Sequence, residues 1–351
     1  MNPLNPLNPL NPLNPLNPLN PLNPLNLLNN KQQTTNTEQK TPNPKPQTIT
    51  HLMESIKKYL SLIKFSHTIF AMPFAMIGFF LGWRFIKELH ALGFDTLPDS
   101  KRVLVLLILV VLCMVFARSA AMAFNRYLDY KIDAKNPRTA IREIPAGIIS
   151  PKNALLFTII CGLLFIATTF FINTLCFYLS FVALFVILFY SYTKRITALC
   201  HLVLGLGLSL APIGAFLAIT GVFNLLPVLF SLIVLTWVSG FDIIYALQDE
   251  AFDRENNLNS IPVLMGKKGA LLFSTCLHIA TAMIVLYIGY FYLNAIWYWI
   301  GATTFIAMLM YQHSIVKPDD LSKVNIAFMT ANGIASVVFS IFVIIEIFTK
   351  S

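Results

Sequence analysis

Three long stretches without a charged side chain constrain this chain more than any other feature of its sequence. They run from 153 to 193, from 196 to 241 and from 269 to 316. A helix of about 20 apolar residues crosses a bilayer, so each stretch is long enough for two spans. Charged residues make up 12% of the chain, whereas soluble domains carry roughly 25%. Since helices satisfy their own backbone hydrogen bonds in lipid, we predict an all-α polytopic membrane protein.

Nine spanning helices fit between the polar segments of the sequence. They are expected at about 65–86, 103–124, 154–172, 175–193, 198–221, 225–247, 269–291, 296–316 and 325–347. Most lysines and arginines lie in the N-terminal tail and in the connections that follow every second span. Such an excess marks the cytoplasmic side of a membrane protein. The sequence therefore predicts an integral protein of the inner (cytoplasmic) membrane, with its N-terminal tail inside and its C-terminus on the opposite side.

Residues 1–50 have the composition of a disordered tail. Eight copies of Asn-Pro-Leu fill positions 2–25, and a polar tract follows them. Proline at every third position removes backbone donors, and the segment cannot bury a core. The basic segment 51–64 is expected to lie on the membrane surface as an amphipathic segment, and 65–351 to form the transmembrane domain. This domain needs nothing before Met53, so Met1 and Met53 are alternative starts of the functional protein.

The formal net charge of +9 does not indicate a nucleic-acid-binding protein. Lysines and arginines lie between the spans, as membrane orientation requires, and form no basic stripe on a soluble domain. The five cysteines all lie in apolar segments without CxxC spacing, which favours helix packing over zinc or disulfides. We therefore expect the lipid bilayer as the partner of this chain, with no nucleic acid and no obligate protein partner.

Two acidic motifs stand at the ends of apolar runs. In the first, Asn125, Asp129 and Asp133 are spaced by four residues, so they share one face of a helix. The second is expected to form one helical stripe with steps of three, four and four residues: Asp242, Tyr245, Asp249 and Asp253. Carboxylates crowded together repel each other unless a cation lies between them. Two such clusters facing each other are typical of a site for Mg²⁺, which is usually held by a few carboxylates together with substrate phosphates.

Basic and aromatic side chains accompany both motifs. Arg118 lies two turns before the first motif, on the same face and inside an apolar span. Ionisable residues at such positions usually face a cavity, and the alternative is that Arg118 extends to the nearby membrane surface. Arg142 lies in a turn-forming loop, and Tyr190 stands four residues before Lys194. Lys194 and Arg195 end a span, and taken singly they fit ordinary residues of the cytoplasmic side.

Acidic clusters, Mg²⁺ and cations together describe a clamp for a diphosphate at a membrane. Metal ions neutralise phosphate oxygens, and guanidinium groups bind such oxygens with two hydrogen bonds. A polyprenyl diphosphate has this kind of anionic head and a long apolar tail. Neutralising the leaving diphosphate favours cleavage of its C–O bond to an allylic cation, which an electron-rich aromatic ring can capture. The alternative from another class is a transporter, although acidic residues at the ends of spans argue against it.

Five segments of the sequence carry a family resemblance: 64–75, 125–140, 142–150, 190–195 and 245–253. They read KFSHTIFAMPFA, NRYLDYKIDAKNPRTA, REIPAGIIS, YSYTKR and YALQDEAFD. From about Ile63 to the C-terminus the chain resembles the UbiA superfamily of intramembrane aromatic prenyltransferases. The resemblance implies nine helices around a central cavity, with Mg²⁺-diphosphate bound by the two aspartate-rich motifs. Many members begin the first motif with Asn-Asp, whereas this chain has Asn125 and Arg126, as in the hydroxybenzoate-type branch.

The resemblance also implies roles for individual residues. The implied metal ligands are Asn125, Asp129, Asp133, Asp249 and Asp253, and the four aspartates among them are the implied catalytic residues. The implied substrate-binding residues, which contact the diphosphate or an aromatic acid, are Arg118, Arg142, Tyr190, Lys194, Arg195, Asp242 and His67. A packing role is the alternative for His67. Asp249 and Asp253 are candidates for removing the ring proton.

The branch that the sequence resembles most transfers a polyprenyl group to 4-hydroxybenzoate in ubiquinone synthesis, at the ring carbon ortho to the hydroxyl. A related branch prenylates a carboxynaphthoate in the futalosine route to menaquinone. A haem vinyl group is the third, least similar, acceptor. Both acids carry a carboxylate, which suits a pocket with surplus cations. The length of the prenyl chain depends on tunnel packing, so the sequence leaves it open.

Overall fold

The computed structural model describes residues 57–63, 71–94 and 97–349. The predicted disordered tail 1–50 and half of the predicted surface segment 51–64 lie outside these residues, as do Met53 and His67. Within the surface segment, residues 57–62 are helical.

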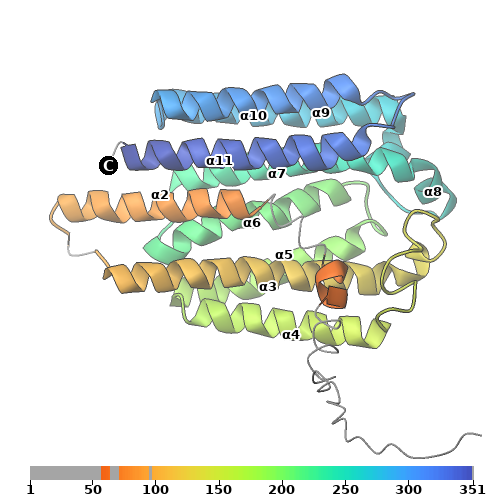
Figure 1. The fold of residues 1–351 in the computed structure, drawn as a ribbon, viewed down its shortest axis with the longest axis horizontal. Helices are drawn as coiled ribbons and strands as arrows, with labels where there is room; N and C mark the ends of the chain where they lie inside the picture. Colours follow the sequence, from red (N-terminus) through yellow and green to blue (C-terminus); the bar gives the residue numbers. More distant parts are fainter. Residues whose placement is uncertain (1–56, 64–70, 95–96, 350–351) are drawn as a thin grey trace, which may run out of the picture. The chain divides into compact units, whose positions relative to one another are not determined.

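Nine long helices account for most of the described residues (Figure 1): α2 (Met72–Ala91), α3 (Ser100–Asp133), α4 (Pro151–Phe170), α5 (Thr174–Thr193), α6 (Cys200–Thr220), α7 (Leu225–Ala246), α9 (Ile261–Phe291), α10 (Ile296–Ile315) and α11 (Asn332–Thr349). Two short helices, η2 (Leu247–Asp249) and α8 (Glu250–Glu255), join α7 to α9. A π-helix, η3 (Ile326–Ala331), precedes α11. No strand occurs within the described ranges, so the predicted all-α fold is confirmed.

Seven helical segments are long and apolar enough to cross a membrane. The helices α2 and α10 are not among the seven. The second half of α2 carries Arg84, Lys87 and Glu88, and α10 contains tryptophan, tyrosine and glutamine side chains that lower its mean hydropathy. The predicted polytopic membrane protein is therefore confirmed, while the expected number of nine spans is approximate.

Polar side chains begin several helices where the sequence places turns. Ser150 and Asn173 each accept a hydrogen bond from the backbone N–H three residues later, at 3.2 and 2.8 Å. Asn224 and Ser260 begin α7 and α9 in a similar way. Such caps satisfy backbone donors that the first turn of a helix leaves unpaired. The tight turn that the sequence predicts near Asn173 is present between α4 and α5.

The described helices pack side by side along much of their length (Figure 1). α6 packs against both α2 and α7, α3 packs against α4, and α10 packs against α11. Aromatic rings from α2, α7, α10 and α11 meet in the core, with neighbouring centroids 5.0 to 6.3 Å apart: Phe74, Trp237, Phe305 and Phe339. Such ring contacts add to the stabilisation from buried area. This aromatic core holds the four helices against one another.

Gly78 allows α2 and α6 to approach closely. A β-carbon at this position would lie 2.0 Å from the carbonyl oxygen of Pro212, a backbone atom that cannot rotate away. We expect Gly78→Ala to destabilise the protein by roughly 1–3 kcal/mol, the usual range for overpacking. The matched control is Gly333→Ala on α11, where an added β-carbon meets nothing within 4 Å. Equal melting temperatures of the two variants in detergent would contradict this packing.

The two acidic motifs differ in their helical setting. α3 continues through Asp133, beyond the predicted end of its span at 124, so the first motif lies on one unbroken helix as its spacing predicts. α7 ends at Ala246, and the chain then turns through η2 into α8. The helical stripe expected for the second motif is therefore interrupted by a short 3-10 helix, since Asp242 lies on α7 whereas Asp249 ends η2 and Asp253 lies on α8.

Candidate active site

A cavity of about 840 Å³ lies among α3, α4, α5, α6 and α7. Polar side chains line one part of it: Arg118, Asn125, Arg126, Arg138, Arg142, Glu143, Tyr190, Asp242, Tyr245 and Asn325. Apolar side chains line another part and include Val110, Ile172, Leu179 and Leu217. On α3 the lining runs from Arg126 to Val110, which is about 24 Å at 1.5 Å per residue. The cavity therefore has a charged end and a long apolar end.

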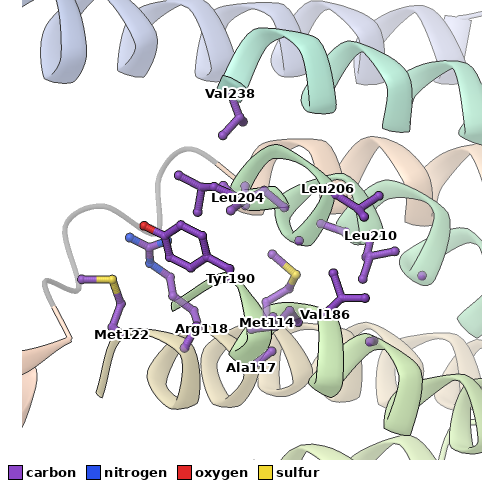
Figure 2. A pocket seen from close by; sticks show the side chains of 18 of the residues that line it. Met114, Ala117, Arg118, Met122, Val186, Tyr190, Leu204, Leu206, Leu210 and Val238 are labelled. Carbon is purple, nitrogen blue, oxygen red and sulfur yellow. The ribbon is translucent and has the colours of Figure 1, made fainter. Parts of the chain in front are cut away.

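Two arginines in the charged part lack hydrogen-bond partners at one guanidinium nitrogen. The Nε atoms of Arg118 and Arg126 are buried, and neither has a partner among the residues that the structure describes. Figure 2 shows Arg118 beside Tyr190, on the other side of the cavity from Leu206 and Leu210. A buried donor without an acceptor is unfavourable. Both guanidinium groups therefore offer donors to an anion that enters the cavity.

The acids of the first motif are held by cations. Asn125 donates a hydrogen bond to Asp129 (3.1 Å). Arg195 forms an ion pair with the same carboxylate at 2.7 Å, and Arg142 pairs with Asp133 at 2.7 Å. The side chain of Asp133 is only 8% exposed. Paired charges of this kind avoid the penalty of an isolated buried carboxylate.

The second motif is neutralised in the same way. Arg138 binds both carboxylate oxygens of Asp249 and also donates to the hydroxyl of Tyr245 (3.0 Å). Lys194 pairs with Asp253 at 2.7 Å, and the Asp253 side chain is 1% exposed. Burial alone would lower the pKa of Arg138, but the hydrogen bonds and the charge of Asp249 outweigh it and raise that pKa. The Arg138 guanidinium therefore stays charged.

Arg138 is a residue of this site that the sequence interpretation did not single out. It lies within the motif segment 125–140, but the basic loop contains other cations and the sequence does not show which one reaches Asp249. Asn136 in the same loop also donates to Asp249 (3.3 Å). The only feature of the sequence that pointed to Arg138 was its position next to Pro137, in a loop that follows an acidic motif.

The structure brings the two acidic motifs together through shared segments. Lys194 pairs with an acid of the second motif, and the adjacent Arg195 pairs with an acid of the first. Likewise, the loop after α3 provides Arg138 for the second motif and Arg142 for the first. In Figure 1 this loop and α8 lie at the same end of the helices. The implied metal ligands and most of the implied substrate-binding cations therefore belong to one network.

The oxygen donors of this network suit Mg²⁺. Among the residues that the structure describes, no three acidic, histidine or cysteine groups are arranged to enclose a metal ion by themselves. Mg²⁺ does not require such a cage, because it is commonly held by one or two carboxylates, water and substrate phosphates. Each carboxylate here has a cation beside it that an arriving diphosphate could attract instead. The donor set fits Mg²⁺ that is bound together with a diphosphate.

Asp242 is separated from the other acids of its motif. It lines the cavity from α7, and its Oδ2 atom lies 2.7 Å from Nδ1 of His201 on α6. His201 is buried, and it is not one of the site residues that the sequence predicted. Only the packing of α6 against α7 brings these two residues together.

The sequence matches the model of the UbiA prenyltransferase family over residues 71–334. A 4-hydroxybenzoate octaprenyltransferase from Aliivibrio fischeri (strain MJ11) is 30% identical over 251 residues, which make up 71% of this chain and 85% of the relative. The enzyme of the same name from Nitrosomonas europaea is 30% identical over 252 residues, or 71% and 84% of the two chains.

Solved structures share the fold. The apo structure of a UbiA homolog from Aeropyrum pernix K1 has a TM-score of 0.65 and 27% sequence identity, and the match covers 81% of this chain and 98% of that one. A UbiA homolog from Archaeoglobus fulgidus bound to GPP and Mg²⁺ has a TM-score of 0.63 and 21% identity, with 83% and 99% covered. At that identity the second likeness shows the fold alone.

Proposed function

The chain belongs to the UbiA prenyltransferase family and is an integral membrane prenyltransferase, and from this premise we propose its substrates. The proposed reaction is the Mg²⁺-dependent transfer of a polyprenyl group from polyprenyl diphosphate to 4-hydroxybenzoate, at the ring carbon ortho to the hydroxyl. Support comes from the two relatives named 4-hydroxybenzoate octaprenyltransferase, since this chain matches about 85% of the length of each.

The observation that carries the proposal is the division of the cavity into a charged and an apolar part. The charged part contains arginine donors and borders both acidic motifs, and the apolar part continues along α3 toward Val110. A polyprenyl diphosphate has the same division between a charged head and a hydrocarbon tail. Burying the tail supplies binding energy, at about 25 cal/mol per Å² of apolar surface.

The residues proposed to hold Mg²⁺ and the diphosphate are those of the ion-pair network. The proposed metal ligands are Asn125, Asp129, Asp133, Asp249 and Asp253. When bound, Mg²⁺ supplies positive charge that neutralises the phosphate oxygens of the leaving group. Arg138, Arg142, Lys194 and Arg195 are positioned to turn from the carboxylates toward the diphosphate, to which they donate charge-assisted hydrogen bonds. These donors stabilise the negative charge that develops as the C–O bond breaks.

The acceptor acid is proposed to bind next to Arg118. The unpaired Nε donor of Arg118 lies beside Tyr190 in the cavity, and a carboxylate is the natural acceptor for a guanidinium group. Held in this way, the aromatic ring lies within the cavity where an allylic cation forms. The apolar side chains of α3, α5 and α6 that line the cavity limit capture of that cation by water.

We expect Arg118→Met to raise KM for the acid about 10- to 100-fold while KM for the polyprenyl diphosphate changes little. The expected size corresponds to the loss of a hydrogen bond to a charged group, roughly 1.5–3 kcal/mol. Initial rates measured against each substrate in turn give the two constants. Arg84→Met is the matched control, because Arg84 forms an i,i+4 ion pair with Glu88 on the surface of α2. A larger change in the diphosphate KM would contradict the assignment.

An acceptor screen tests the proposed function directly. Membranes containing the protein are incubated with a polyprenyl diphosphate, Mg²⁺ and either 4-hydroxybenzoate or a carboxynaphthoate, and the products are identified by mass spectrometry. We expect prenylated 4-hydroxybenzoate. If only the carboxynaphthoate is prenylated, the proposed reaction stands with a different acceptor. If neither acid is prenylated, the proposal is rejected.

The active site is proposed to face the cytoplasm of an inner-membrane protein. The asymmetry of lysine and arginine supports this orientation, since both acidic motifs border loops rich in these residues. Cysteine placed at Ser322, in the loop between α10 and η3, should resist a membrane-impermeant thiol reagent in intact cells and react after lysis. Labelling in intact cells would reverse the proposed orientation.

A further inference from the structure

His201 and Asp242 form a buried pair at the wall of the cavity. Nδ1 of His201 lies 2.7 Å from Oδ2 of Asp242, and the His201 side chain is 5% exposed. Asp242 lines the cavity, whereas His201 is not among its lining residues and lies behind the carboxylate. Nε2 of His201 is buried without a hydrogen-bond partner among the described residues. This short hydrogen bond therefore joins Asp242 of α7, at the cavity wall, to His201 of α6.

The chemistry of the two groups fixes the direction of this hydrogen bond. An ionised carboxylate can only accept, so Nδ1 of His201 donates the hydrogen. A donor to the ionised form stabilises it and also fixes the orientation of the carboxylate. Asp242 consequently presents a rotationally fixed anionic oxygen at the cavity wall.

The other aspartates of the second motif are differently placed. Asp249 is bound through both oxygens by Arg138, and Asp253 is paired with Lys194. Neither is among the described residues that line the cavity. Asp249 already shares both oxygens with Arg138, which itself lines the cavity, and Asp253 is proposed to hold Mg²⁺, so neither carboxylate is free to take a proton from an aromatic ring. Asp242 has both access and orientation.

We propose that His201 is a positioning residue that holds the Asp242 carboxylate toward the cavity, where Asp242 accepts the proton released by the aromatic acceptor. This inference rests on the proposed function. The C–O bond of the polyprenyl diphosphate breaks, and its electron pair leaves with the diphosphate. A π-electron pair of the ring forms the new C–C bond. The C–H pair at the same carbon then restores aromaticity as the proton moves to an oxygen of Asp242, which later releases it to water.

Ring-deuterated acceptor tests this assignment. If ring-proton removal is fast in the wild-type enzyme, 3,5-dideuterated and ordinary 4-hydroxybenzoate give nearly equal kcat. Asp242→Asn is expected to lower kcat about 10²- to 10⁴-fold, the usual contribution of a general base. It should also expose a primary isotope effect, because proton removal becomes the slow step. A slower variant without an isotope effect, or one with wild-type kcat, would overturn the role of Asp242.

Substitutions of His201 separate positioning from a merely structural role. His201→Leu removes the donor and is expected to lower kcat about 10- to 100-fold, with the same isotope effect and little change in either KM. His201→Asn keeps an amide donor near the position of Nδ1 and should restore most of the activity and remove the isotope effect. Equal loss in both variants, without an isotope effect, would reject the positioning role.

A second histidine provides the matched control. His313 on α10 also donates or accepts an interhelical hydrogen bond, to His278 at 2.9 Å, but is not among the residues that line the cavity. His313→Leu should show no isotope effect even if its melting temperature falls. Product formation by the wild-type enzyme in the same assay tests the proposed function separately. If the wild-type enzyme forms no product, the substrate assignment fails; if it forms product but the variants show no isotope effect, only the roles of His201 and Asp242 fail.

Discussion

Asp249→Ala is expected to abolish prenyl transfer while the protein remains inserted and folded. Asp249 is the carboxylate of the second motif that binds Arg138 through both oxygens, and Asn136 also donates to it. Its loss would remove a proposed metal ligand and leave the Arg138 guanidinium without its partner. Removing one preorganised electrostatic group typically lowers kcat by about 10²–10³-fold, and a metal ligand is expected to exceed that range. Product formation in purified membranes, per amount of folded protein, measures the effect.

The neighbouring acid gives a matched control for Asp249. Glu250 forms an i,i+4 ion pair with Arg254, which is largely exposed, and it has no proposed contact with substrate. Surface pairs of this kind contribute little to stability. Glu250→Ala should therefore keep wild-type turnover and the same melting temperature. Turnover of Asp249→Ala similar to that of Glu250→Ala would contradict the assignment of the second motif.

Removal of divalent cations is expected to have an equally large effect. EDTA should reduce product formation to background, and added Mg²⁺ should restore it, because the diphosphate would otherwise face four carboxylates without a neutralising metal ion. Binding of the prenyl diphosphate, measured without turnover, should depend on Mg²⁺ in the same way. A prenyl diphosphate should raise the melting temperature only when Mg²⁺ is present, since a ligand stabilises the state that binds it.

Two controls make the metal experiment specific. Ca²⁺ is larger and prefers more oxygen ligands, so it should restore activity less well than Mg²⁺. The Asp249→Ala variant should lose the Mg²⁺-dependent rise in melting temperature, whereas Glu250→Ala should retain it. Full activity in EDTA would show that the reaction does not need a divalent metal ion, and the proposed metal ligands would then be wrong.

The local periodicity of the sequence accounts for much of the fold. Helical segments and the turn at Asn173 follow from apolar runs and caps, which involve residues close together in the chain. The shared face of Asn125, Asp129 and Asp133 follows in the same way, because α3 is unbroken. The second motif could not be placed so well. Its α-helix is interrupted by the 3-10 helix η2 after Ala246, and η2 and α8 both pack against α9, which is distant in sequence from Asp242.

The partners of the acids are the part that sequence reasoning missed. Arg195 reaches Asp129 across 66 positions and Arg138 reaches Asp249 across 111 positions. Several cations are available in each loop, and nothing in the local pattern selects among them. His201 and Asp242, 41 positions apart, were likewise not associated.

The sequence by itself determined that this chain is a helical membrane protein, where most of its spans lie, and that two aspartate-rich motifs end two of them. These properties depend on hydrophobicity and on the 3.6-residue period, which act over one or two turns of chain. Only the tertiary structure decided which cation neutralises each carboxylate, which residues line the cavity and that Asp242 faces it with His201 behind. Such contacts are set by the packing of helices distant in sequence, and no local pattern specifies them.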